Sequence, residues 1–418
     1  MTLLRDRNFR GLFLADTASQ AGTQILVLAM PLVAVTALHA TTFQVGVLAM
    51  CQTVAFVLIG LPAGGLVDRL PRRNVMIVSD WGRALALASV PLAWWTGVLT
   101  IYQLYGVALA LGVFTVFFDV AYQSYVPHLV ERDQLVRGNS ALEVVRTVAQ
   151  LGGPSLGGYL VQFVTAPFAL VATVLGFAWS ALCLTTIRKP ETRTPARGSL
   201  RIMEGVRFVF GHPRLRRIAG CTATANLFGA MAQPMVLLLL ARELGLGAGA
   251  IGLIMAAGGL GGFLGALLTG RLTRWLGEHR TLWLAIAVPA PLLLLVPLAQ
   301  PDWRLGLVVA QEFAMGVGAV VYNVSQLSYR QSVTPDELLG RMNATMRFAV
   351  WGTLPLGGLL GGVLGTTLGI RPTIALAGAG GCLAFLWVVS RRTPPSGRPA
   401  PAGSAGPASD ASSRTGRG

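Results

Sequence analysis

The chain has few charged residues, few cysteines and no HExxH or P-loop motif. Only 12% of its 418 residues are charged. Its 4 cysteines form no CxxC pair and have no Cys/His spacing suited to zinc. HExxH and P-loop motifs are absent, and the GxSxG match at Gly153–Gly157 lies inside a long apolar run and not at a strand-to-helix turn. The sequence thus gives no support for an enzyme, an ATP-driven pump or a metal site, and a gradient would have to supply any energy.

Apolar residues make up most of the chain. With 53% hydrophobic residues and a mean hydropathy of +0.63, it is too apolar for a soluble domain of this size. Apolar runs of about 18 to 25 residues, long enough to cross a bilayer as helices, recur between short charged turns. We predict an all-α integral membrane protein with about twelve transmembrane helices. The predicted spans are 12–38, 43–67, 74–95, 102–122, 140–163, 168–187, 217–240, 248–269, 281–298, 304–327, 342–367 and 372–390.

Basic residues are distributed unevenly between the predicted loops. They gather before the first span and after each even-numbered span, whereas the opposite loops hold only Arg242, Arg304 and Arg371. Cytoplasmic loops carry such an excess of Lys and Arg. We expect a multi-pass protein of the inner (cytoplasmic) membrane with both termini in the cytoplasm. A net charge of +16 would suggest nucleic-acid binding in a soluble protein, but no basic cluster here alternates with aromatic residues, so no nucleic acid is expected.

Two sequence echoes indicate an internal duplication. Gly65 and Arg69 recur as Gly270 and Arg274, about 205 residues later, and the pattern from Arg146 to Gly158 recurs about 200 residues later. A hydrophilic stretch separates the two copies. The predicted domains are an N-terminal six-helix bundle (1–187), a cytoplasmic linker (188–216) with an amphipathic stretch at 200–210, a C-terminal six-helix bundle (217–390) and a disordered cytoplasmic tail (391–418). Parallel repeats place a substrate cavity between the halves near mid-bilayer.

The turn after the second span holds one carboxylate and three arginines between two apolar runs. Its pattern, Gly64-x-Leu66-x-Asp68-Arg69-x-x-Arg72-Arg73, resembles the loop signature of the major facilitator superfamily, with Pro71 where glycine is usual. Asp68 stands where a carboxylate can hold basic groups or cap the next helix. The resemblance implies a gating motif of Gly65, Asp68, Arg69, Arg72 and Arg73, with Arg72 paired to Asp119 in the fourth span. The alternative is a basic loop that only sets topology.

A second motif lies in the fifth span. Gly153-Pro154-x-x-Gly157-Gly158 resembles the core motif of drug:proton antiporters in the same superfamily. Asn8-Phe9-Arg10 and Phe118-Asp119 further resemble the branch that contains macrolide-efflux proteins and the enterobactin exporter. These resemblances imply two pseudo-symmetric six-helix bundles, alternating access and export of a small molecule. They leave open whether the glycines couple transport or only allow close packing.

Ionisable residues inside predicted spans are costly and are therefore functional candidates. Asp80 with Arg83, and Glu143 with Arg146, are spaced three apart, so the spacing favours mutual neutralisation, a structural role, for both pairs. Glu312 has no basic residue three or four positions away, and desolvation favours its protonated form. We expect the proton-coupling candidates to be Glu312, Asp16 and Glu143, although a buried neutral acid would also explain Glu312.

The superfamily architecture lines the substrate cavity with the first, fourth, seventh and tenth helices. The residues that this implies as wall candidates are Gln20, Gln24, Phe114, Phe118, Asn226, Gln233 and Asn323. Such a wall suits an amphipathic ligand. We expect proton-driven export of a drug, macrolide or siderophore-like metabolite, by a monomer in the lipid bilayer whose partners are its substrate and protons, with no cofactor. Uptake by the same fold and a non-transporting sensor or scaffold are the alternatives.

Overall fold

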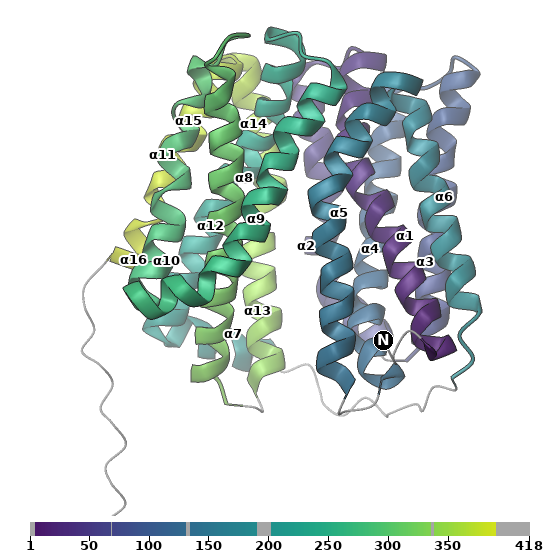
Figure 1. Ribbon diagram of the computed structural model, residues 1–418, viewed down its shortest axis with the longest axis vertical. Coiled ribbons are helices and arrows are strands. Elements are labelled where there is room, and N and C mark those ends of the chain that lie inside the picture. The colour runs from purple at the N-terminus through teal and green to yellow at the C-terminus, as the bar shows by residue number, and fades with distance from the viewer. Residues whose placement is uncertain (1–4, 68, 131–133, 190–201, 336–337, 390–418) are drawn as a thin grey trace, which may run out of the picture.

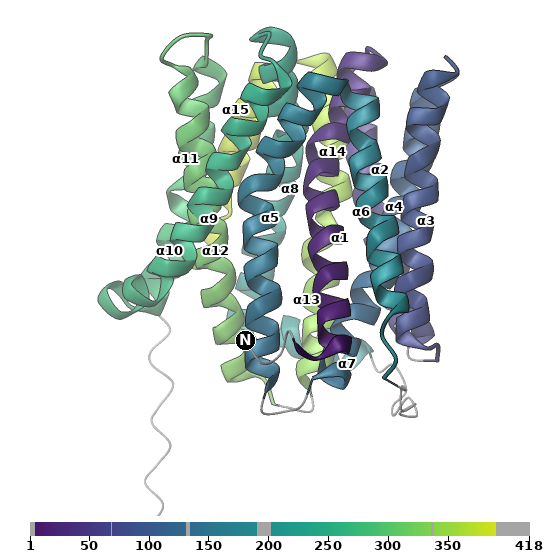
Figure 2. The same ribbon diagram turned by 45° about the vertical axis from the view of Figure 1, so that its right-hand side comes forward.

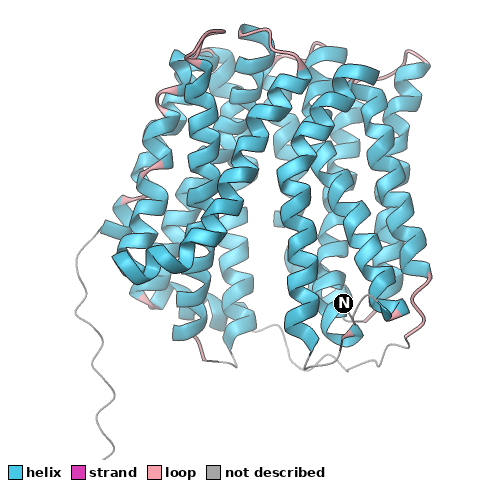
Figure 3. Cartoon of the chain, in the orientation of Figure 1, coloured by secondary structure: helices cyan, strands magenta, loops and turns pink. Residues whose placement is uncertain are grey.

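The computed structural model describes residues 5–67, 69–130, 134–189, 202–335 and 338–389. Asp68, residues 190–201 of the predicted linker and the predicted tail lie outside this part. Within it the chain is nearly all helix and contains no strand (Figure 3). The all-α prediction is confirmed.

The helices fall into two groups of similar size, seen as two halves of the molecule in Figure 1. The N-terminal half contains α1 (Arg7–Leu32), α2 (Thr42–Val67), α3 (Arg72–Trp95), α4 (Ile101–Leu129), α5 (Leu135–Val164) and α6 (Ala166–Thr185). The C-terminal half contains α7 (Ile202–Gly211), α8 (Pro213–Leu238), α9 (Ala248–Leu276), α10 (Glu278–Ala287), α11 (Pro289–Leu293), α12 (Leu305–Val333), α13 (Leu339–Trp351), α14 (Thr353–Thr367), α15 (Ile370–Leu383) and α16 (Leu386–Val389).

Every predicted span coincides with a helix or a broken helix. In the described part, 10 helices are long and apolar enough to cross a membrane. α5 and α15 fall short of that measure, because α5 is rich in glycine and glutamine and α15 has only 14 residues. The predicted ninth span is broken into α10, α11 and the short 3₁₀ turn η5 (Val296–Leu298), where prolines remove backbone donors. The predicted amphipathic stretch forms α7.

The duplication is visible in the backbone. α1 contains Pro31 and ends in a wide π turn, η2 (Val33–Ala37). α8 contains Pro234 and ends in the corresponding turn, η4 (Leu239–Glu243). The same proline and the same unwinding at equivalent places support the interpretation of the two halves as copies of one unit.

The halves contact each other most closely through two helix pairs, α5 with α9 and α2 with α14, and α2 also contacts α8 and α13. In each pair the approach is between glycines: a Cβ on Gly158 would lie 3.1 Å from the Gly252 Cα, and one on Gly46 would lie 2.4 Å from the Gly362 Cα. Such small residues let helix backbones touch. All four glycines lie toward the end of the bundle opposite the N-terminus, which we call the closed end (Figures 1 and 2).

Polar contacts also join the halves at the closed end. The Arg242 guanidinium donates to the Ala40 carbonyl, and the Gly249 N–H donates to Gln162 Oε1 over 3.1 Å. One apolar core, which includes Met30 and Leu48 from one half and Ile251 from the other, is shared there. Toward the N-terminus the buried cores are separate, one in the N-terminal half and others in the C-terminal half. The halves therefore share a buried apolar core at one end only.

The other end, which we call the basic end, carries the N-terminus, the α2–α3 turn and α7. Its arginines include Arg7, Arg72 and Arg207. The closed end has fewer cations, and two of them have acidic partners: Arg371 bonds Glu243 over 2.6 Å and Arg304 lies 3.9 Å from Asp302. The uneven charge along the sequence therefore becomes an uneven charge between the two ends of the bundle.

Candidate functional site

Three adjoining cavities lie among the helices of the two halves. The first, of about 270 Å³, is lined from both halves, by Thr23, Gln52 and Thr115 on one side and Gln233 and Met255 on the other. The second, of about 400 Å³, lies mainly among C-terminal helices and also reaches α2. The third, of about 220 Å³, lies wholly within the C-terminal half. Gln233 lines all three, so it stands where they meet.

The predicted wall residues divide by half. Gln233, Asn226 and Asn323 line the second cavity, and Asn226 also donates to the Val350 carbonyl over 3.2 Å. The N-terminal candidates line none of these three cavities. Phe114 lies over Gly82 of α3, where a Cβ would come 2.4 Å from its ring. In this arrangement α4 directs its aromatic rings into its own half, so the N-terminal part of the expected wall stays a prediction.

The remaining N-terminal candidates make local contacts. Gln20 donates to Asp16 over 3.5 Å, and Gln24 packs on Gly153 of α5. Phe118 is buried and stacks on Tyr122. Instead α2 supplies polar wall residues that sequence reasoning missed, Gln52 and Thr53. The signal was an amide and a hydroxyl in an otherwise apolar span, on a helix that was not expected to face the cavity.

Glu312 lies on the wall of the third cavity, beside Gln311. Gln311 is 3% exposed, and its Oε1 has no hydrogen-bond partner in the described part of the chain. Glu312 likewise forms no hydrogen bond or ion pair with any described residue. Gly258 of α9 closes on the carboxylate, since a Cβ there would lie 3.4 Å from Glu312 Oε2. The Gln311 amide oxygen and the Glu312 carboxylate thus line a mostly apolar cavity, and no described residue donates a hydrogen bond to either of them.

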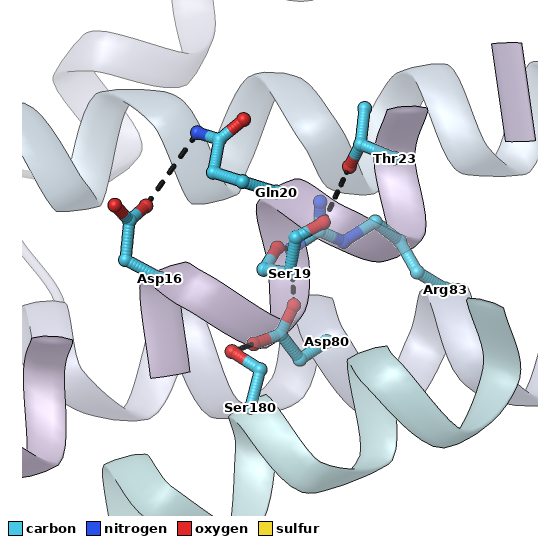
Figure 4. Close-up of polar contacts among 7 residues, drawn as sticks. All are labelled: Asp16, Ser19, Gln20, Thr23, Asp80, Arg83 and Ser180. Atoms are coloured by element: carbon cyan, nitrogen blue, oxygen red, sulfur yellow. Dashed lines mark hydrogen bonds and ion pairs between the residues drawn. The ribbon is translucent and has the colours of Figure 1, made fainter. Parts of the chain in front are cut away.

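Asp16 is buried in the N-terminal half, 3% exposed, and has polar neighbours. Gln20 donates to it (Figure 4). The Tyr122 hydroxyl also lies beside this carboxylate. The charges of Arg146 and Glu143 on α5 also act on it. Glu143 and Arg146 form no ion pair with each other, although both are described, so the expected neutralisation within that pair is wrong.

A second buried network joins four helices of the same half. The Arg83 guanidinium donates to the Asp80 carboxylate on the same helix and lies 3.4 Å from Ser19 Oγ on α1 (Figure 4). The Ser180 hydroxyl of α6 donates to Asp80 over 2.6 Å. The guanidinium carbon lies 4.3 Å from the centroid of the Phe118 ring, and Phe177 lies on its other side at 4.4 Å. The predicted Asp80–Arg83 pair is confirmed, and its surroundings indicate a structural role.

No metal site is indicated. The described residues contain no group of three His, Cys, Asp or Glu side chains that could hold a metal ion. The cysteines described, Cys51, Cys183, Cys221 and Cys382, form no disulfide.

Comparison with known proteins identifies the family. The family model of the Major Facilitator Superfamily matches residues 12–353. The chain belongs to the major facilitator superfamily. Membership places it among transporters rather than enzymes, and the resemblance noted in the α2–α3 turn is confirmed.

Two characterised relatives of this superfamily member are exporters by name. The chain is 28% identical over 386 residues to the multidrug efflux pump Tap of Mycolicibacterium fortuitum, covering 87% of this chain and 90% of the relative. It is 26% identical over 338 residues to the enterobactin exporter EntS of Salmonella typhimurium, covering 80% of each. A solved bacterial homologue of the iron transporter ferroportin has the same fold, with a TM-score of 0.73 at 16% identity over 94% of this chain and 100% of that one.

The described arginines of the α2–α3 turn bond to helices of their own half. Asp68 lies outside the described residues. Arg72 lies 3.4 Å from the Ser124 carbonyl of α4, and Arg73 donates to the Leu184 and Thr185 carbonyls of α6. Gly65 has open space around it, and Arg69 is exposed.

Asp119, the expected partner of Arg72, forms no ion pair with it in this arrangement. The arginines whose charges act on Asp119 are Arg83, Arg347 and Arg146. Arg347 belongs to the C-terminal half and lies over the Trp351 ring. An acid of one half is thus within electrostatic reach of a cation of the other.

The residues of the antiporter-type motif lie on two faces of α5. On each face, two of them are one helical turn apart. A Cβ on Gly153 would lie 2.2 Å from the Gln24 side chain, and one on Gly157 would lie 3.2 Å from the Ile25 Cα, so both pack on α1. Gly158 packs on Gly252 of α9, and the Pro154 carbonyl lies 2.4 Å from where a Gly252 Cβ would be. The motif therefore holds α5 against its own half and against the other half together.

Proposed function

We propose that this transporter exports a small amphipathic molecule by alternating access, in exchange for protons. Two observations together support this most directly. The cavities are lined by amides and apolar groups, and the two halves share a buried core at one end only. A second state, closed at the basic end and open at the other, needs only a rocking of the halves about these cavities. The export activity named for Tap and EntS, which are relatives at low identity, favours this direction.

We place the basic end in the cytoplasm of a cell with an inner membrane. An excess of arginine at one end is typical of cytoplasmic loops. Both termini and the α7 linker region then lie in the cytoplasm, and the present arrangement receives cargo from that side. A tag at either terminus that reacts with a membrane-impermeant reagent in intact cells would contradict this orientation.

The proton sites proposed are Glu312, Asp16 and Glu143. Asp16 is buried and Glu312 is half-buried, and acids inside membrane spans are retained where they exchange protons or bind cargo. Glu143 is exposed on α5, and its charge acts on Asp16. The turn that contains Asp68 and Arg72 is proposed to stabilise one of the two states, open or closed, of the basic end. A monomer is proposed to carry out the whole transport cycle.

Accumulation of a compound panel in cells that express the protein, with and without a proton uncoupler, tests the function. Export predicts lower accumulation of at least one compound, abolished by the uncoupler. Higher accumulation than in empty cells would instead indicate uptake, and no change for any compound would contradict transport of that panel.

Alternating access has its own test at the α5–α9 contact. Gly252→Leu places a side chain against the Pro154 carbonyl and should prevent closure at that end. We expect transport to fall at least about tenfold, equivalent to about 1.4 kcal/mol, while the protein still reaches the membrane. Gly270→Leu is the matched control, because Gly270 has no atom within 4 Å of its Cβ position. Equal transport by both variants would refute the proposed closed-end contact.

A further inference from the structure

We propose that the third cavity binds a protonated amine of the exported molecule, with the Glu312 carboxylate and the Gln311 amide oxygen as its two acceptors. The inference rests on the proposed function, since the amine belongs to the cargo. It adds a chemical class of substrate and a binding residue, Gln311, that the sequence did not single out.

The cavity is apolar apart from three side chains. Helices α8, α9, α11 and α12 enclose about 220 Å³, and among the lining residues only Gln233, Gln311 and Glu312 are polar. None of the lining residues is Arg, Lys or His. No cation of the protein therefore neutralises the carboxylate inside this space.

The two acceptors have no donors among the described residues. Gln311 is 3% exposed with Oε1 unpartnered, and Glu312 makes no hydrogen bond or ion pair. Buried polar groups in folded proteins are almost always hydrogen-bonded, and leaving one unpaired costs about 1–3 kcal/mol. A site with two unpaired acceptors, one of them a carboxylate, is thus suited to a ligand that brings donors and positive charge.

An ammonium group meets these requirements. It has three N–H donors, so it can bond the carboxylate and the amide oxygen together. An anion would be repelled, and a neutral apolar group would leave both acceptors unpaired. The volume suits a small aromatic amine, because a protein cavity of about 150 Å³ is known to hold benzene. A ring with a short ammonium arm fits the 220 Å³ available.

The cargo can reach this site from the space between the halves. Gln233, Leu237 and Met255 line both the third cavity and the first. Gln233 is exposed at this junction and makes no hydrogen bond to the described residues, so its amide is free to bond a passing ligand. The amine would therefore occupy a side pocket while the rest of a larger cargo remains in the central cavity.

Binding of 2-phenylethylamine and its neutral analogue 2-phenylethanol tests the proposal. The full chain is purified into lipid nanodiscs without a gradient, and binding is measured by equilibrium dialysis with protein-free nanodiscs subtracted. We expect the amine to bind at least about tenfold more tightly than the alcohol. Glu312→Gln should abolish this preference, and Gln311→Leu should weaken amine binding several-fold, while neither should change alcohol binding more than about twofold. Asp302→Asn removes the same charge from an exposed loop and should change nothing.

Equal affinity of the wild-type protein for amine and alcohol would overturn the amine site, as would an unchanged preference in folded Glu312→Gln. Unchanged amine binding in Gln311→Leu would remove Gln311 from the site. These outcomes are separate from failure of the proposed function: export in cells without amine preference removes only this inference, whereas amine binding without export of any compound removes the transport proposal.

Discussion

The two halves share one helical plan, but Asp16 and Asp80 of the first half and Glu312 of the second have different surroundings. In the N-terminal half, Asp80 is bonded to Arg83 and Ser180, and Asp16 has Gln20 and Tyr122 beside it. In the C-terminal half, Glu312 and Gln311 face a cavity with no such partners in the described chain. A duplicated unit can therefore use polar groups for cohesion in one copy and leave them available to a ligand in the other.

Equivalent positions of the two repeats also differ in charge. Phe118-Asp119 in α4 stands where Tyr322-Asn323 stands in α12, so a carboxylate in one half is an amide in the other. Arg146 and Arg347 occupy equivalent places, and the charges of both act on Asp119. The charge balance is thus shared between the halves and not repeated within each.

The largest effect should come from breaking the N-terminal network. Asp80→Ala leaves the Arg83 guanidinium buried without its carboxylate, and loss of one partner of a buried ion pair costs about 3–5 kcal/mol. We expect a strongly lowered unfolding temperature in detergent. Asp302→Ala removes an exposed acid and serves as the control. An Asp80→Ala protein as stable as the control would show that the network does not hold the half together.

A smaller loss is expected from the hydroxyl that completes the same network. Ser180→Ala removes the 2.6 Å hydrogen bond to Asp80, and a hydrogen bond to a charged group contributes about 1.5–3 kcal/mol. The unfolding temperature should fall less than in Asp80→Ala. In the double variant the Ser180 change should add little, because its partner is gone. Full additivity of the two changes would place Ser180 outside the network.

Replacing Glu312 in the C-terminal half should raise stability, whereas replacing Asp80 should lower it. Glu312→Met replaces a carboxylate without partners by an apolar side chain of similar length in an apolar cavity. We expect stability to rise by about 1 kcal/mol, because an unpaired buried acid is costly. Thermal unfolding measured beside Asp80→Ala gives the comparison. Destabilisation as large as in Asp80→Ala would mean that both halves use their acids for cohesion.

The smallest effect is expected at the surface of the closed end. Glu243→Gln breaks a pair with Arg371 in which both side chains are about one third exposed. Exposed pairs contribute about 0.2–1 kcal/mol, and Arg371 keeps its bonds to the Pro297 and Ala299 carbonyls. The unfolding temperature should barely change. A large loss would indicate that this pair, and not the glycine contacts, holds the closed end.

Sequence reasoning found the helices because span length and apolar content are local properties. It also found Glu312, since a carboxylate without a nearby basic residue stands out within an apolar run. It could not decide which helix faces the cavity: Phe118 packs on Arg83 inside its half, while Gln52 of α2 reaches the space between the halves. Nor could it foresee that Arg72 would bond a carbonyl of α4, because a long flexible side chain reaches several acceptors.

The position of Gln233 bears on how such a transporter can change its substrates during evolution. One side chain borders three spaces that differ in shape and polarity. A single codon change there would alter the fit of ligands in all three together, whereas changes elsewhere on the walls would act on one space at a time. During selection for a new cargo, a single substitution of Gln233 would therefore change selectivity more than a single substitution elsewhere on the walls.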